Sequence, residues 1–86
     1  MPRISAFFGI VILMYFDDHE PPHFHAHHGN GSAKVRIDLI EMRHSTLGRR
    51  EHRLVLAWAE LHREELLMNW RRARAHETMV QIPPLR

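Results

Sequence analysis

His23–Asp38 reads HFHAHHGNGSAKVRID, in which two alternating segments flank a turn. Successive residues of a strand point to opposite faces, so each segment places its apolar residues on one face and its polar residues on the other. The residues expected on the apolar face are Phe24, Ala26, Ala33, Val35 and Ile37. Gly29-Asn30-Gly31-Ser32 has the composition of a tight turn. We therefore predict an antiparallel hairpin, because so short a connection cannot cross over to a parallel strand.

The segments around this hairpin predict further strands. Phe8–Phe16 is apolar, β-branched and aromatic and ends at two aspartates, as a buried strand does. Pro21-Pro22 excludes a regular helix from the connection that follows. Glu41–His44 can form a fourth short strand. The sequence thus predicts a small antiparallel meander of three to four strands over about residues 8–44.

A long amphipathic pattern begins near Arg49 and ends near Ala75. Its stripe comprises Leu54, Val55, Trp58, Leu61, His62, Glu65, Leu66, Asn69, Trp70 and Ala73. This spacing predicts one long helix over about residues 49–75, packed across one face of the sheet in an α+β fold. We expect Ile82 and Leu85 to pin an extended C-terminal tail against the domain.

The composition indicates one domain over residues 1–86, and a chain this short makes a homodimer or a protein partner plausible. There is no cysteine, which excludes disulfides, thiolate metal sites and a cysteine nucleophile. The start of the chain lacks the pattern of a signal peptide, and the apolar run at 7–16 is too short to cross a bilayer as a helix. We expect a cytoplasmic protein with no membrane contact.

Histidine is the outlying residue type, with nine among 86 residues. His23 and His25 share a strand face and lie about 6–7 Å apart at the backbone. That spacing suits two ligands of one metal ion, or a general acid and a general base around one reacting group. Pro21-Pro22 stiffens the approach to the pair. The plain alternative is a solvated polar strand face.

The helix offers a second set of polar residues. His62 and Glu65 stand three apart, so Glu65 can orient His62, and His62 can join His23 or His25 where helix and sheet meet. The catalytic candidates are therefore His23, His25, His62 and Glu65. The metal alternative combines His23 and His25 with His19 or His62 on Zn²⁺ or another divalent transition metal, completed by Glu20 or Asp18. A structural hydrogen-bond network is the plain reading of the helical set.

Two arginines stand where the predicted helix begins. Backbone N–H groups at a helix start, beside Arg49 and Arg50, can hold a phosphate. The alternative is that both arginines are solvated residues of the first turn. The histidines expected to take no part in a site are His27, His28, His44, His52 and His76.

The residues also resemble a known family. The segments that carry the resemblance are Pro2–Phe16, Asp18–Ala26 with its Pro-Pro-His-Phe-His element, Arg49-Arg50, Leu54–Trp70 and Ile82–Leu85. Together they are similar to the small bacterial domain of unknown function 4160 over nearly the whole chain. Gly48 departs from the proline expected before the two arginines.

The resemblance implies which gene lies beside this one, but it does not imply a particular reaction. Members of the family are encoded beside a second small protein, in a layout like a type II toxin–antitoxin pair, which would make this chain the toxin-like component and give it an antitoxin-like cognate partner. Three hypotheses follow: a ribonuclease that needs no metal and acts on RNA through its histidines, a histidine-rich metal-binding module, and a non-catalytic domain that binds the cognate partner.

Overall fold

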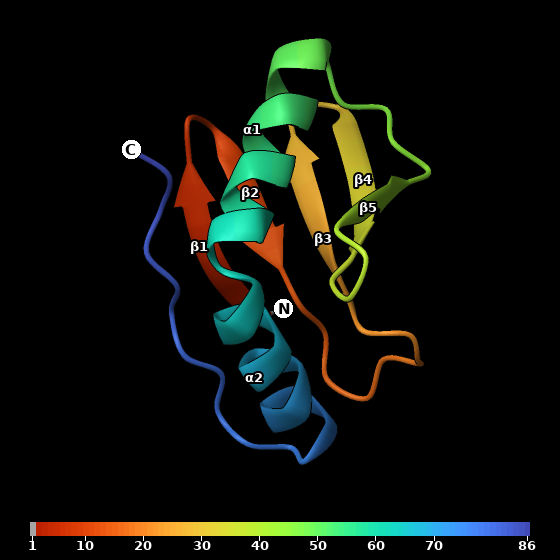
Figure 1. The fold of residues 1–86 in the computed structure, drawn as a ribbon, viewed down its shortest axis with the longest axis vertical. Helices are drawn as coiled ribbons and strands as arrows, with labels where there is room; N and C mark the ends of the chain where they lie inside the picture. The colour runs from red at the N-terminus through yellow and green to blue at the C-terminus, as the bar shows by residue number, and fades with distance from the viewer. Residues whose placement is uncertain (1) are drawn as a thin grey trace.

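The computed structural model describes residues 2–86 and contains five strands followed by two helices (Figure 1). The strands are β1 (Arg3–Phe7), β2 (Ile10–Leu13), β3 (His23–His28), β4 (Gly31–Arg36) and β5 (Glu41–Arg43). The helices are α1 (Arg49–Leu61) and α2 (Arg63–Arg74). The strands form one sheet in the order β1-β2-β3-β4-β5, with every neighbouring pair antiparallel. The predicted α+β meander is confirmed, and its strand count is corrected to five.

The first hairpin is where the strand prediction was wrong. Phe8–Phe16 is not one strand, because the chain reverses at Phe8 and Gly9 and pairs β1 with β2. Both turn residues have positive φ, 49° and 77°, as the central pair of a tight hairpin turn requires. Phenylalanine rarely adopts that conformation, so the apolar run concealed the turn and the strand before it.

The helical segment is divided, which corrects the prediction of one long helix. The break lies at His62, whose φ of −115° and ψ of 25° are not helical. A straight helix over 49–75 would be about 40 Å long at 1.5 Å per residue. The longest dimension of the fold is 34 Å, so an unbroken helix would extend past the sheet that it covers. Within residues 2–86, neither helix is long and apolar enough to span a membrane.

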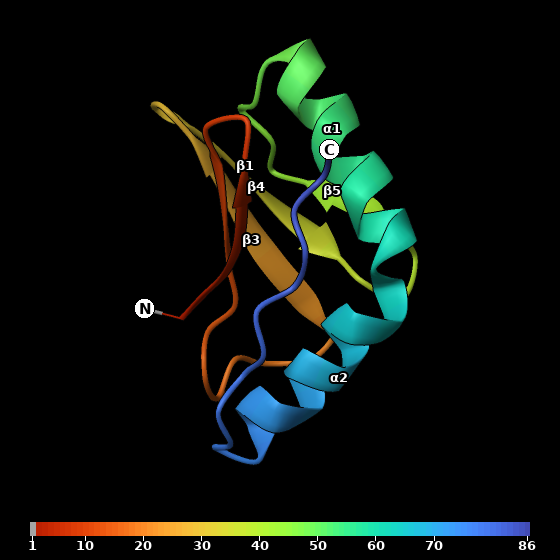
Figure 2. The same cartoon turned by 90° about the vertical axis from the view of Figure 1, so that its left-hand side faces the viewer.

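The sheet carries both helices on one face and leaves the other face uncovered by helices (Figure 2). The covered face is apolar: Phe24 and Ala26 are fully buried, as are Val35 and Ile37. Trp58 of α1 packs edge-on against Phe24, with ring centroids 5.7 Å apart. The predicted alternation is therefore confirmed, and it places His25, His27 and the polar residues of β4 on the opposite face.

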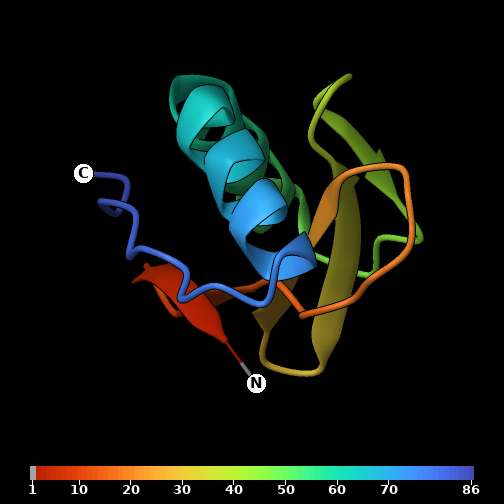
Figure 3. The same ribbon diagram turned by 90° about the horizontal axis from the view of Figure 1, so that it is seen from below.

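The C-terminal tail runs between β1 and the helices (Figure 3). The backbone N–H of Ile82 donates to the carbonyl of Ile4 at 2.8 Å, and the Trp58 indole N–H donates to the Pro83 carbonyl at 2.9 Å. Ile82 is buried in the core and Leu85 packs partly against it. Both residues hold the tail, as the sequence predicts.

Candidate metal centre

His23 and His25 occupy the first half of β3 and point to the same face, but the fold encloses them differently. His23 is 2% exposed, because α2 and the connection between β2 and β3 close over the end of the strand. The side chain of His25 is 27% exposed. Their ring centroids lie 5.2 Å apart. One imidazole is thus fixed in the interior, and its neighbour lies at the border with solvent.

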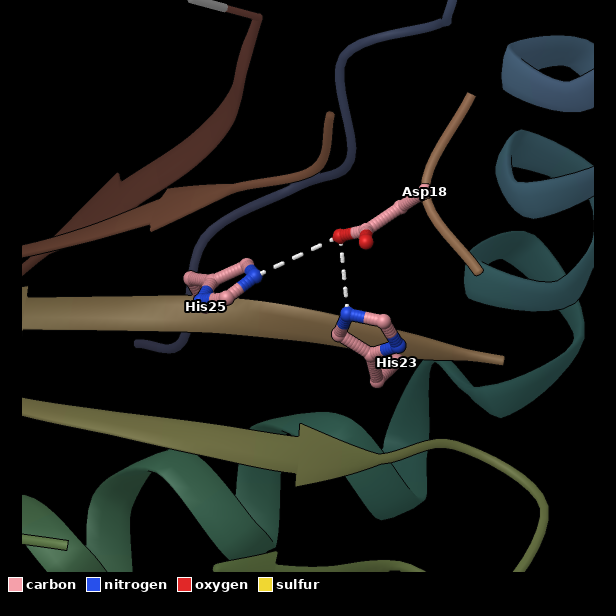
Figure 4. Close-up of side chains that lie close together, drawn as sticks. All are labelled: Asp18, His23 and His25. Atoms are coloured by element: carbon pink, nitrogen blue, oxygen red, sulfur yellow. Dashed lines mark ion pairs between the residues drawn. The ribbon is translucent and has the colours of Figure 1, made fainter. Parts of the chain in front are cut away.

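Asp18 completes a compact group with the two histidines. It belongs to the connection that follows β2, which turns at Asp17 (φ 57°) and passes above β3. Figure 4 shows the Asp18 carboxylate extending toward both rings. One of its oxygens, Oδ2, lies 2.8 Å from Nε2 of His23 and 3.6 Å from Nε2 of His25. One ligand atom of each of the three residues lies within 4.8 Å of the other two.

The hydrogen bond on the far side of His23 decides what Nε2 can do. Nδ1 of His23 lies 2.8 Å from the carbonyl oxygen of Pro21, which only accepts, so Nδ1 carries a proton and donates it. In the neutral ring, Nε2 then presents a lone pair to a carboxylate oxygen at 2.8 Å. Two lone pairs this close repel each other unless a cation, either a proton or a metal ion, lies between them. A backbone carbonyl that fixes the other nitrogen is also the usual arrangement of a metal-binding histidine.

His25 offers a second nitrogen beside the same carboxylate. Its Nε2 is buried and has no hydrogen-bond partner within residues 2–86. Burial lowers the pKa of the imidazole, which favours the neutral ring with a free lone pair. Buried polar atoms normally have a partner, so an unpaired nitrogen directed at a carboxylate suggests a ligand position.

Asp18 is held in its ionised form. Burial acts to raise the pKa of its carboxyl, but the backbone N–H of His19, together with the positive charge and hydrogen bond of a His23 ring protonated on both nitrogens, outweighs burial, so the pKa lies below its usual value. The His19 N–H donates to Oδ1 at 3.0 Å, and Nδ1 of His19 lies 3.2 Å from the same oxygen. His19 therefore orients the carboxylate from the solvent side, while Oδ2 faces the two imidazoles.

The three ligand atoms lie close enough together to share one metal ion. In a tetrahedral site with bonds of roughly 2.0–2.2 Å, neighbouring ligand atoms lie about 3.4 Å apart. The separations of 2.8 and 3.6 Å lie on either side of that value, and the shorter one is also the length of a charge-assisted hydrogen bond. Two histidine nitrogens and one carboxylate oxygen form a ligand set typical of catalytic zinc and of mononuclear iron.

The last turns of α2 hold the connection that carries Asp18. Nη1 of Arg74 donates to the backbone carbonyl of Asp18 at 2.8 Å. Glu20 accepts a hydrogen bond from the Trp70 indole at 3.3 Å and pairs with Arg74 at 3.8 Å. The Trp70 ring packs against His23, with centroids 5.3 Å apart. Glu20, an alternative ligand by sequence, is thus directed to α2 and not to the histidines.

His62 and Glu65 form a pair of their own. Nδ1 of His62 is hydrogen-bonded to the Glu65 carboxylate, as the spacing suggests, and the ring packs against Trp58 at 5.5 Å between centroids. These contacts lie at the break between the helices. No contact in the described part of the chain joins His62 to His23 or His25, so the structure does not bring the helical pair into the centre.

Arg49 and Arg50 are also remote from the centre. They begin α1, at the end of the sheet opposite the connection that carries Asp18 (Figure 1). Arg50 pairs with Glu51 at 3.2 Å and lies over the Phe8 ring. The basic residues that do adjoin the histidines come from the neighbouring strands: Lys34, Arg36 and Arg43.

Asp18 is the residue that the sequence identified least well. The sequence predicts it only as one of two alternative carboxylate ligands, beside Glu20. Strand periodicity aligns His23 with His25, but it carries no information about an irregular connection. The available signal was local: two aspartates close a strand five residues before the histidine pair, within reach of one short loop.

The comparisons with known proteins place the chain in one family. No curated protein and no solved structure matches it. A family model described as a domain of unknown function, DUF4160, matches residues 9–71, which include β2, the Asp18 connection, β3 and most of the helical segment. Because this match covers well over half of the sequence, the chain belongs to the DUF4160 family.

Proposed function

We propose that this chain is a metal-binding protein whose Asp18, His23 and His25 hold one divalent transition-metal ion at a site with open coordination positions. The observation that supports it is the convergence of Nε2 of His23, Nε2 of His25 and Oδ2 of Asp18, with the far nitrogen of His23 fixed by the Pro21 carbonyl. Three protein ligands leave at least one position for water or substrate.

The chain supplies each requirement of such a centre. His23 anchors the ion from the interior, and Asp18 brings a negative charge that offsets part of the ion's charge. His25 and Asp18 retain partial exposure, 27% and 17% of their side chains, so small molecules can reach the open positions. An ion held in this way would act as a Lewis acid that lowers the pKa of bound water, which is the chemistry of metal-dependent hydrolysis.

The competing function is acid–base catalysis by the histidines without a metal, in a toxin-like protein acting on RNA. A general acid or a general base must come within hydrogen-bond reach of the substrate proton that it transfers. Here both Nε2 atoms are directed at one carboxylate oxygen, and His23 is almost inaccessible. This arrangement favours a shared cation over a shared substrate.

The test is the metal content of protein prepared without a histidine tag. After incubation with Zn²⁺ and removal of excess metal, we expect about one ion per chain by elemental analysis. His25→Ala should lose the ion. His27→Ala is the matched control, because His27 lies on the same strand and face but outside the cluster, and it should retain the metal. Metal-free wild-type protein, or equal retention by His25→Ala, would contradict the proposal.

A further inference from the structure

The sheet face that no helix covers carries a row of basic groups across three strands. His25 of β3 pairs with Lys34 of β4, and Lys34 pairs with Arg43 of β5. Directly paired residues lie side by side on one face, with Cβ atoms about 4.5–5.5 Å apart. The row therefore begins at the candidate metal centre and crosses the sheet away from it.

Two pockets lie along this face and share part of their walls. The first, of about 220 Å³, is lined by Pro21, His23, Lys34, Arg36, Arg43 and His44. The second, of about 250 Å³, is lined by His25, His27, Ser32, Ala33, Lys34 and His44. Lys34 and His44 belong to both, so the pockets adjoin, and each contains one of the two metal-binding histidines. Neither set of lining residues contains an acidic side chain.

The ion pairs on this face show which charges are available to a ligand. Arg36 is held by Asp38 through two hydrogen bonds, at 2.7 and 2.9 Å, and Arg43 pairs with Glu41. Lys34 forms no ion pair in the part of the chain that the structure describes. A divalent ion bound to Asp18 would also keep a net positive charge. Two uncompensated positive charges, the ion and Lys34, would then lie on either side of His25.

We propose that this groove binds the phosphodiester backbone of a short single-stranded nucleic acid and presents it to the metal centre, an inference that rests on the proposed function. Successive pockets with basic walls favour a ligand that carries several anionic groups in a row. The exposed rings of His27 and His44 offer flat surfaces against which unpaired bases can stack. An arginine held by a carboxylate still has N–H donors to spare, so Arg36 and Arg43 can contact phosphate while keeping their ion pairs.

The test measures binding of a fluorescent, single-stranded uridine oligonucleotide by anisotropy, over a series of salt concentrations, with zinc-loaded protein. Lys34→Gln should weaken binding about tenfold and reduce the slope of log K against log salt by about one, because one phosphate contact is lost. Arg53→Gln is the matched control: it removes the same charge from an exposed position of α1, on the helix-covered side of the sheet, and should leave affinity and slope unchanged.

The outcomes separate this inference from the proposed function, since metal content is measured on the same samples. Three results would contradict nucleic-acid binding in this groove even if zinc is bound: unchanged binding by Lys34→Gln, an equal loss in Arg53→Gln, or equally tight binding of a polyglutamate peptide. Wild-type protein that contains no zinc would contradict the proposed metal centre. If oligonucleotide affinity still falls only in Lys34→Gln, the anion-binding face is supported without the metal.

Discussion

His23 and His25 stand two residues apart on one strand and perform different tasks. His23 is almost completely buried, is hydrogen-bonded through Nδ1 to the Pro21 carbonyl, and packs against Trp70. His25 lies in edge-to-face contact with Tyr15, at 4.7 Å between centroids, and keeps part of its surface exposed. In the proposed metal site, the first would therefore fix the position of the ion, and the second would border the solvent from which water or substrate arrives.

Asp18→Asn tests the role of charge at nearly constant shape. The amide keeps one oxygen but loses the negative charge, so it is a far weaker ligand for a divalent ion. We expect zinc affinity to fall by more than the roughly 10–100-fold that is typical of substituting an outer-shell partner. Competition with a chromogenic chelator measures the affinity.

Asp17→Asn is the control for this substitution. Asp17 is adjacent in sequence but pairs with His76 at 2.8 Å, away from the two imidazoles. Its substitution should leave zinc affinity unchanged. Equal losses in the two variants would indicate a general effect of negative charge on the connection and would remove Asp18 from the ligand set.

Among the elements, α2 positions the centre without contributing a ligand. Its last turn reaches the Asp18 carbonyl through Arg74, and its Trp70 covers His23. The break at His62 makes this arrangement possible, because it lets α2 follow the end of the sheet and the connection beyond it. The shape of the helical segment is thus linked to the site through the connection between β2 and β3.

Arg74→Ala should weaken zinc binding by roughly 10–100-fold while leaving the ligands in place, since Arg74 orients the segment that carries Asp18. Arg71→Ala is the control, because it removes an equal charge from the same turn of α2, and the Arg71 side chain is hydrogen-bonded to Met68 and not to the Asp18 connection within residues 2–86. Isothermal titration gives both affinities, and circular dichroism of the metal-free proteins checks the fold. Parallel changes in both variants would contradict the positioning role.

Some of these elements could be predicted from the sequence, and others could not. Period-two alternation predicted the faces of β3 and β4, because a buried sheet face strictly selects apolar residues. The sequence did not predict the turn at Phe8 and Gly9, because nothing in the composition marks a phenylalanine that adopts positive φ. The break at His62 was not predicted either, because no glycine or proline marks it.

At the scale of the whole molecule, the fold separates its core from its polar face. The helices and the tail cover one side of the sheet, and the other side carries His25, His27 and the basic row. The pair His23 and His25 could be predicted because one strand carries both. Asp18, Lys34 and Arg43 could not be assigned to the site, because strand register and an irregular connection bring them there.

The location of the ion is the central claim, and anomalous X-ray scattering at the zinc edge tests it most directly. Crystals of untagged, zinc-loaded protein should show one strong peak at bond lengths of roughly 2.0–2.2 Å from Nε2 of His23, Nε2 of His25 and a carboxylate oxygen of Asp18. A peak bound by other residues, or no peak in crystals grown with zinc, would contradict the account.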